Sequence, residues 1–233
     1  MPLSAREVNR LGERIKAGPL TEDDRRLLLE FRASFLPAYQ EVIAKIREAL
    51  EVDPTGRPEK TPESIIAKLR RGDVENLASM QDIAGCRIVV DSRYLQDQWV
   101  EAIRGLFEKA KPIDRRQDPS HGYRAVHVIV RTRGRQIEVQ VRTSLQDRWA
   151  NVVERFTEAM GVDFKHGEQA PDDPWLKWLE LGAECIDRVE RMDNPELVQG
   201  LDNHELDRYR RGQFSALMLL VPYIRELSQV PGE

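Results

Sequence analysis

Two carboxylates stand on separate segments of this chain, each next to residues that should be buried. Asp82 leads into the apolar, β-branched run 86–90, and Glu138 alternates with the apolar residues Ile137 and Val139. An acidic side chain that approaches a core is costly unless a cation faces it. Carboxylate oxygens from separate strands suit Mg²⁺ held beside nucleotide phosphates. Together with a basic helix, such a pair would suit metal-assisted transfer from a nucleotide.

Basic side chains gather on a helix expected to begin at Thr61 and end near Arg71. Lys60 precedes this helix, and Ser64, Lys68 and Arg71 follow at intervals that place them on one stripe. A helix N-terminus flanked by cationic side chains is a suitable cradle for a polyphosphate. Taken alone, the same spacing is more often a solvated basic face.

Further polar side chains accompany the strands. Arg87 at the start of the run 86–90 could stack its guanidinium plane on a base, or form an internal ion pair with Asp82. Strand alternation places Tyr123 and His127 on one face of a strand expected over 123–131. In the next strand, alternation gives a polar row with an apolar reverse face, formed by Glu138, Gln140 and Arg142.

The elements that must position these residues follow from apolar periodicity. Helices are predicted in the first residues and over 22–51, 61–71, 93–109, 143–160, 174–193 and 203–229, with Pro222 kinking or ending the last. Strands are predicted at 86–90, 123–131 and 135–141, the last two as a hairpin. Amphipathic helices need a sheet face to bury their stripes. We therefore expect an α/β fold with a mixed central sheet flanked by helices, and with helical extensions at both ends.

Composition limits the class of protein. The chain has 233 residues, 40% hydrophobic and 33% charged, which is enough for one substantial core. A net charge of −4 gives no global field for nucleic acid. The two cysteines, Cys86 and Cys185, have no CxxC spacing, which favours buried thiols in a reducing compartment. No apolar run is long enough for a membrane span or a signal core, so a cytoplasmic protein with no membrane partner is expected.

Four blocks, in order across residues 57–165, resemble the synthetase module of the RelA/SpoT family. They are KTPESIIAKLRR, QDIAGCRIVV, GYRAVHVIV and IEVQVRT, followed by a helix that starts with Trp149-Ala150. The resemblance implies a nucleotidyltransferase-like fold. We expect one synthetase domain over 1–233, with N-terminal helices at 1–52, a catalytic core at 53–167 and C-terminal helices at 168–233.

The resemblance also implies the reaction and the roles of the residues. The β,γ-pyrophosphate of ATP would pass to a ribose 3′-hydroxyl with Mg²⁺ as cofactor, and AMP would leave. The ATP phosphates would be held by Lys60, Ser64, Lys68 and Arg71, while Arg87 would stack on adenine. Asp82 and Glu138 would hold the metal, and Glu138 would also deprotonate the acceptor hydroxyl. Acceptor binding would fall to Tyr123, which stacks on the base, and to His127, Gln140 and Arg142, which orient phosphates.

The chain departs from the family pattern at two places. Family members carry an arginine two residues before the position of Lys60, where it forms one side of the adenine sandwich; here that residue is Pro58. Either Arg57 reaches in from an altered turn or one side of the sandwich is lost. Glu154-Arg155 stands where the family has Glu-His. The hydrolase and regulatory domains of the long enzymes have no room in this length, so we expect a stand-alone small synthetase.

The acceptor stays open at this stage. GDP or GTP would give the alarmones (p)ppGpp of the stringent response. The blocks 79–87 and 144–150 look closer to the toxic small synthetases of toxin–antitoxin systems, several of which modify the 3′-terminal adenosine of tRNA. An RNA backbone could be steered by basic residues ahead of Tyr123, which also fit a solubilising loop: Lys109, Lys111, Arg115 and Arg116. ATP or ADP is a third acceptor.

Partners and activity have alternatives too. An antitoxin protein and a second copy of this chain stay open as partners. From another functional class, the chain could be a non-catalytic nucleotide- or RNA-binding module that retains the fold. The simultaneous presence of both carboxylates, the basic helix and the tyrosine favours the enzyme.

Overall fold

The computed structural model describes residues 3–117, 119, 123–160 and 174–192, so the helix predicted over 203–229 and its Pro222 lie outside the described residues. The helices are α1 (Ala5–Ala17), α2 (Glu22–Ala33), α3 (Leu36–Leu50), α4 (Pro62–Arg71), the 3₁₀ turn η1 (Leu77–Ser79), α5 (Arg93–Leu106), α6 (Ser144–Met160) and α7 (Pro174–Met192). The strands are β1 (Thr55–Arg57), β2 (Gly85–Val90), β3 (Ala110–Asp114), β4 (Val126–Thr132) and β5 (Arg135–Thr143).

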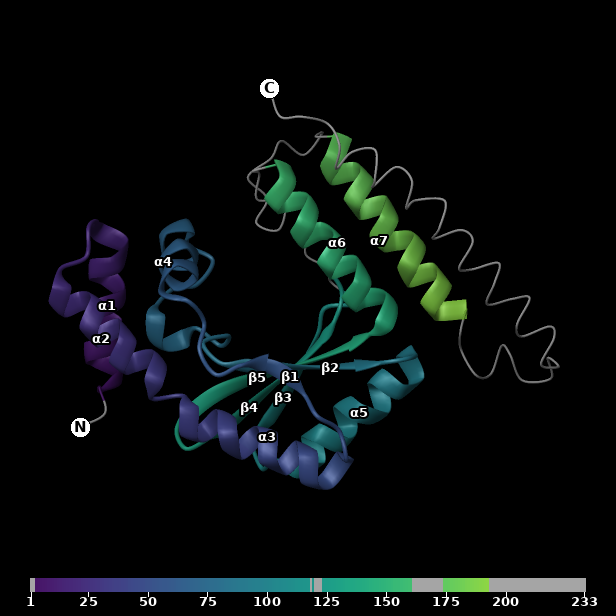
Figure 1. Cartoon of the computed structure of the whole chain (residues 1–233), viewed down its shortest axis with the longest axis horizontal. Helices are drawn as coiled ribbons and strands as arrows, with labels where there is room; N and C mark the ends of the chain where they lie inside the picture. Colours follow the sequence, from purple (N-terminus) through teal and green to yellow (C-terminus); the bar gives the residue numbers. More distant parts are fainter. Residues whose placement is uncertain (1–2, 118, 120–122, 161–173, 193–233) are drawn as a thin grey trace. The chain divides into compact units, whose positions relative to one another are not determined.

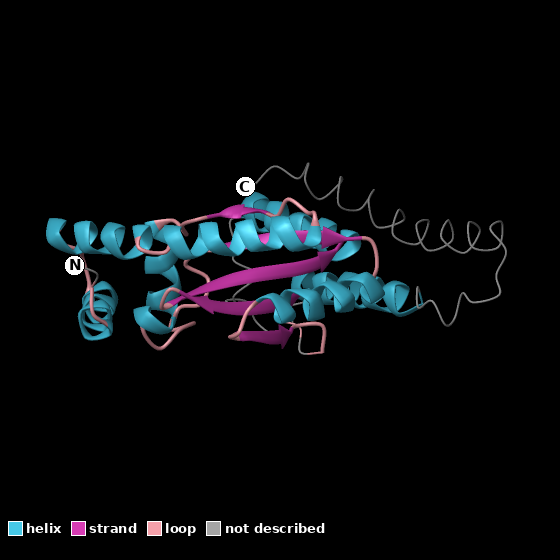
Figure 2. Ribbon diagram, turned by 90° about the horizontal axis from the view of Figure 1, so that it is seen from below, coloured by secondary structure: helices cyan, strands magenta, loops and turns pink. Residues whose placement is uncertain are grey.

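The strands form one five-stranded sheet in the order β1-β2-β5-β4-β3 (Figure 1). The strands and the flanking helices are separated by colour in Figure 2. The mixed α/β fold expected from the sequence is confirmed. The two outer strands, β1 and β3, were not expected. β1 is three exposed residues. β3 contains Pro112, which cannot donate a backbone hydrogen bond; an edge strand tolerates this because one of its two sides has no neighbouring strand.

The prediction of one continuous helix over 22–51 is wrong. α2 ends at Ala33 and α3 begins at Leu36, with Pro37 in its first turn. Proline lacks the amide that would bond to the carbonyl of Ala33, and its ring would clash with that carbonyl inside a continuous helix. The start of α2 is as expected, because Thr21 and Asp24 form a reciprocal capping box.

The β4–β5 hairpin is confirmed, with one correction at its start. Its two turn residues, Arg133 and Gly134, have φ angles of 47° and 71°, the left-handed pair that matches the twist of a two-residue hairpin. β4 begins at Val126 rather than 123, and Tyr123 makes only an isolated bridge outside the strand. The alternation used to place Tyr123 and His127 on one strand face therefore does not apply.

The chain divides into two compact units, each built from segments that are distant in sequence. The first comprises residues 1–88, 100–113 and 127–140, and the second comprises 89–99, 114–126 and 141–233. In the first unit, α1 packs against α2, α4 and η1.

In the second unit, α6 and α7 pack through an apolar cluster formed by Trp149, Val153, Phe156, Leu179, Ala183 and Ile186. Gly182 permits this close approach, since a Cβ there would lie 2.3 Å from the Trp149 ring. The helix predicted over 174–193 is thus present as α7 and packs against α6. Within the described part of the chain, no helix combines the length and apolarity that crossing a membrane requires.

Candidate functional site

Three segments meet beside the start of β2. The amide of Lys60 donates to the carbonyl of Ile83 at 2.6 Å, and the amide of Glu138 donates to the carbonyl of Ala84 at 3.1 Å. Backbone bonds therefore fix the segment that carries Asp82 between the entry to α4 and strand β5. Asp82 and Glu138 both belong to the first unit.

Asp82 faces two ammonium groups. The Nζ atoms of Lys60 and Lys68 lie 2.8 Å and 3.1 Å from the same oxygen, Oδ2. Burial opposes ionisation of Asp82, but the charges and hydrogen bonds of the two lysines outweigh it, and the pKa is lowered below its ordinary value. The other oxygen, Oδ1, is buried and has no hydrogen-bond partner among the described residues. One oxygen of Asp82 thus holds the lysines while the other has unused ligand capacity.

Glu138 is buried, with 9% of its surface exposed. Nδ1 of His127 lies 2.9 Å from Oε1, and Nε2 of Gln140 donates to Oε2 at 2.7 Å. Burial raises the pKa of Glu138, yet the hydrogen bond and charge of His127 and the hydrogen bond of Gln140 leave it lowered. Glu138 is therefore not a water-facing surface residue. His127, Glu138 and Gln140 act as one group.

The two carboxylates interact electrostatically, because the negative charge of Asp82 acts to raise the pKa of Glu138. Two acidic groups at such range and the unpartnered Oδ1 of Asp82 fit a divalent cation. Among the described residues, no group of three or more His, Cys, Asp and Glu side chains gathers as a ready-made cage. Mg²⁺ is usually held by one or two carboxylates plus water and substrate phosphate oxygens, and the two carboxylates would suit such a site.

Helix α4 begins and ends where the sequence predicted. Thr61 caps its N-terminus, and Gly72 ends it with a φ of 79°. Ser64 lies in the first turn, with its hydroxyl 2.8 Å from that of Thr61, and the guanidinium of Arg71 lies 2.9 Å from Asp73. Lys68 points instead to Asp82.

Arg32, at the end of α2, was missed by sequence reasoning. Its Nε donates to the carbonyl of Lys60 at 2.6 Å, and its Nη2 lies 3.2 Å from Glu59. Arg32 therefore fixes the backbone of the first phosphate-binding candidate. A contact across 28 residues leaves no local signal in the sequence.

The pairing of β1 with β2 places Arg57 near Arg87. Thr55 is opposite Arg87 and Arg57 is opposite Gly85 in this antiparallel pair. Residues directly opposite share a face, and so do residues two apart on one strand. Arg57 and Arg87 therefore stand diagonally on the same face of the β1–β2 ribbon.

Tyr123 and Arg142 meet in the second unit. The Arg142 guanidinium lies 5.0 Å from the centroid of the Tyr123 ring, and its Nη2 donates to the tyrosine hydroxyl at 3.1 Å. Nη1 of Arg142 donates to Asp147 at 3.1 Å, and Arg142 is 4% exposed. Of the polar row of β5, Glu138 and Arg142 are thus buried and Gln140 is half-buried. Two of the four predicted acceptor residues meet here, whereas His127 and Gln140 meet at Glu138.

The basic segment ahead of Tyr123 is partly committed to internal contacts. Arg116 lies 2.7 Å from Asp97 and 2.8 Å from Asp114, and its side chain is 10% exposed. Arg116 therefore does not present a free cation to an RNA backbone.

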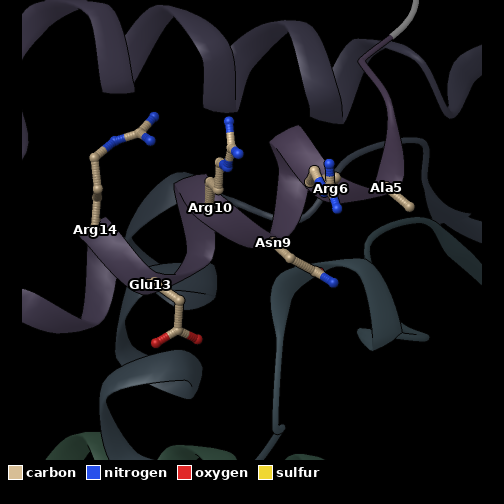
Figure 3. Close-up of a pocket in the computed structure, with 6 residues that line it drawn as sticks. All are labelled: Ala5, Arg6, Asn9, Arg10, Glu13 and Arg14. Atoms are coloured by element: carbon tan, nitrogen blue, oxygen red, sulfur yellow. The ribbon is translucent and has the colours of Figure 1, made fainter.

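A separate pocket runs along α1 and contains none of the predicted site residues (Figure 3). It is lined by Ala5, Arg6, Asn9, Arg10, Glu13 and Arg14. Arg10 and Arg14 project to one side of the helix and Glu13 to the other (Figure 3). Arg14 is paired with Asp24 at 2.6 Å. The carboxylate site of the first unit is distinct in its residues from this depression.

Comparison with known families identifies the region that carries the site. Residues 56–157 match the family described as "Region found in RelA / SpoT proteins". Uncharacterized proteins of Mycobacterium tuberculosis and Mycobacterium bovis are 38% identical over 113 residues, which is 47% of this chain and 41% of theirs. The chain therefore matches about two fifths of the length of these curated relatives.

Solved structures share the fold. The small alarmone synthetase 1 of Bacillus subtilis bound to its product pppGpp has a TM-score of 0.54 at 20% identity, covering 73% of this chain and 98% of that one. A GTP pyrophosphokinase family protein of Streptococcus pneumoniae gives 0.54 at 22%, covering 82% and 98%. A Streptococcus mutans protein gives 0.53 at 27%, covering 77% and 98%. Residues 56–157 therefore resemble the region found in RelA / SpoT proteins, and the chain shares the fold of solved small alarmone synthetases.

Proposed function

We propose that this chain transfers the β,γ-pyrophosphate of ATP to the ribose 3′-hydroxyl of a guanine nucleotide. The observation that carries the proposal is the pair of lysines on one oxygen of Asp82, with Glu138 within electrostatic range. The match of residues 56–157 to the region found in RelA / SpoT proteins supports the reaction class.

The donor side works by exchange of ion pairs. Before ATP arrives, Lys60 and Lys68 share the single negative charge of Asp82, so two ammonium groups lie close together in a partly buried place with a net positive charge. A triphosphate offers the two ammonium groups more negative charge than one carboxylate does. As the lysines turn to the phosphates, Oδ2 of Asp82 is released. Asp82 and Glu138 would then hold Mg²⁺, which when bound neutralises charge on the phosphate oxygens.

The acceptor side centres on Glu138. Its lowered pKa keeps it ionised at neutral pH, and His127 and Gln140 fix its two oxygens. It is placed to take the proton of the 3′-hydroxyl. The new bond joins O3′ to the β-phosphorus, and the bond from that phosphorus to the α,β-bridging oxygen breaks. AMP leaves with the electron pair. A weak base suffices because the transition state for phosphoryl transfer is loose and needs little nucleophile activation.

The adenine of ATP is proposed to lie on the β1–β2 ribbon. Arg87 supplies one guanidinium, and Arg57, diagonal to it on the same face, supplies the second in place of the arginine that position 58 lacks. The geometry supports the shift of one residue because Pro58 lies just past the end of β1.

A guanine nucleotide is favoured over a tRNA 3′ end as the acceptor. Tyr123 offers a ring for stacking of the acceptor base beside the Arg142 guanidinium. The internal pairing of Arg116 weakens the case for a phosphate-steering RNA surface.

The test is label transfer from γ-labelled ATP with GDP, GTP, ATP or deacylated tRNA, each alone and with Mg²⁺. Label on GDP or GTP is expected. Label on tRNA alone would support the same pyrophosphate transfer with tRNA, rather than a guanine nucleotide, as the acceptor. No transfer to any acceptor, with ATP still bound, would overturn the proposal in favour of a non-catalytic nucleotide-binding module.

A further inference from the structure

The buried face of α7 ends in two carboxylates that the mechanism above does not use. Asp187 and Glu190 are each 5% exposed, although they stand in the last two turns of the helix. Negative charge is disfavoured at a helix C-terminus, and burying it is costly without partners. The apolar stripe that docks α7 on α6 would not need them. The ion-pair and hydrogen-bond partners of these two carboxylates must therefore account for their burial.

Asp187 gathers three arginines within the second unit. Arg93 and Arg191 lie 2.6 Å and 2.7 Å from its oxygens, and Nε of Arg124 lies 3.7 Å away. Arg124 is largely buried, and its Nε and Nη1 have no hydrogen-bond partner in the described part of the chain. Asp187 is therefore the negative charge that balances Arg124 in a place with little solvent.

Glu190 holds the junction between β5 and α6. It accepts from the hydroxyl of Thr143 and, at 2.8 Å, from Nε2 of Gln146. Thr143 and Gln146 also cap the first turn of α6 reciprocally, at 3.1 Å and 3.3 Å. Burial raises the pKa of Glu190 despite these two hydrogen bonds. Glu190, near the end of α7, therefore holds the junction at which β5 ends and α6 begins.

Both contacts fall next to the proposed acceptor pair. Arg124 directly follows Tyr123, and Thr143 directly follows Arg142. Tyr123 and Arg142 touch each other and lie on segments that no turn connects locally. The two segments that bring this pair together are thus each held from α7, one by Asp187 and the other by Glu190.

We propose that Asp187 and Glu190 are positioning residues that set the Tyr123–Arg142 pair for the acceptor nucleotide, an inference that rests on the proposed function. α7 then does more than cover an apolar face. Its apolar stripe fixes it on α6, and its buried carboxylates transmit that position to the acceptor residues.

The matched variants are Asp187→Asn and, as control, Glu184→Gln on the exposed side of the same helix, where Glu184 pairs only with Arg188 among the contacts of the described chain. Asp187→Asn is expected to raise the acceptor KM about tenfold while the ATP KM stays within about twofold. A merely structural role would lower the melting temperature and the active fraction and leave both KM values unchanged. That result would overturn the proposal.

Two further measurements separate this inference from the proposed reaction. In a double-mutant cycle, Asp187→Asn and Tyr123→Phe should be non-additive in acceptor KM, because both act on one pair. Hydrogen exchange needs no turnover: residues 123–126 should exchange faster in Asp187→Asn than in Glu184→Gln. If wild-type protein transfers no pyrophosphate, the proposed function fails and exchange alone decides the positioning. Equal hydrogen exchange of residues 123–126 in the two variants would refute the positioning role of Asp187.

Discussion

His127 and Glu138 meet across the β4–β5 hairpin, with 2.9 Å between Nδ1 and Oε1. Gln140, two residues along β5 from Glu138, donates a hydrogen bond to the other oxygen, Oε2. The carboxylate is therefore oriented by one neighbour from each strand. An oriented, ionised and buried carboxylate is what a general base for a ribose hydroxyl needs.

Replacing Glu138 should abolish transfer without unfolding the protein. Glu138→Gln keeps the shape and removes the charge and the proton acceptor, so kcat should fall by roughly 10²–10⁴-fold. Label transfer and thermal melting measured side by side provide the check. Glu101→Gln, at an exposed carboxylate on α5, is the matched control and should keep full activity. An active Glu138→Gln enzyme would refute the mechanism.

Replacing Asp82 should affect both stability and activity. Asp82→Asn leaves two ammonium groups close together with no carboxylate between them. The melting temperature should fall, and saturating ATP should recover more of it than in wild type, since the phosphates supply the missing negative charge. Thermal melting with and without ATP measures this. An unchanged melting temperature without ATP would show that the lysine pairs contribute nothing to stability.

Stability should respond to pH in opposite senses at two places. The pKa values of Asp82 and Glu138 are lowered from ordinary values of 3.8 and 4.5, so their stabilisation is present above those values and is lost as pH falls through the folded pKa. The pKa of Glu190 is raised above 4.5, so its contribution is complete below that value and is lost as pH rises through the folded pKa.

Two variants test these signs by melting across pH. Glu138→Gln should flatten the loss of stability in acid. Glu190→Gln should gain stability relative to wild type as pH rises, because the amide cannot ionise. A Glu190→Gln difference that is independent of pH would contradict the raised pKa.

Arg57 should contribute to ATP binding. Arg57→Ala is expected to raise the ATP KM about fivefold to thirtyfold and leave the acceptor KM unchanged, since a cation over an aromatic face contributes about 1–2 kcal/mol. Arg47→Ala removes another exposed arginine, paired with Asp53, and is the control. An Arg57→Ala enzyme with the ATP KM of wild type would show that adenine is held from one side only.

Sequence periodicity was sufficient for the elements that bury a clear stripe. The hairpin, α4 with its caps and the helix now seen as α7 all appear close to their expected limits. Periodicity failed at the short strand β1 and at β3 with its proline, where the local pattern is absent or broken. It also failed at Pro37, because the apolar period continues across this proline and predicts one helix where the structure has two.

The candidate site could be predicted in its residues but not in its pairings. The types and spacing of Asp82, Lys60 and Lys68 pointed to phosphate chemistry. Which cation neutralises Asp82 depends on the backbone bonds that place Ile83 and Ala84, and no local pattern encodes them. The same is true of Arg32, which reaches the site from a different helix.

Lys60 is held at both of its peptide groups, by Ile83 through the amide and by Arg32 through the carbonyl. Its main chain has little freedom, so the exchange from carboxylate to phosphate must come from rotation of the side chain alone. Such rotations take picoseconds to nanoseconds, whereas loop opening takes up to microseconds or longer. Capture of the triphosphate should therefore proceed at the encounter rate, with no slow isomerisation of this segment in stopped-flow traces.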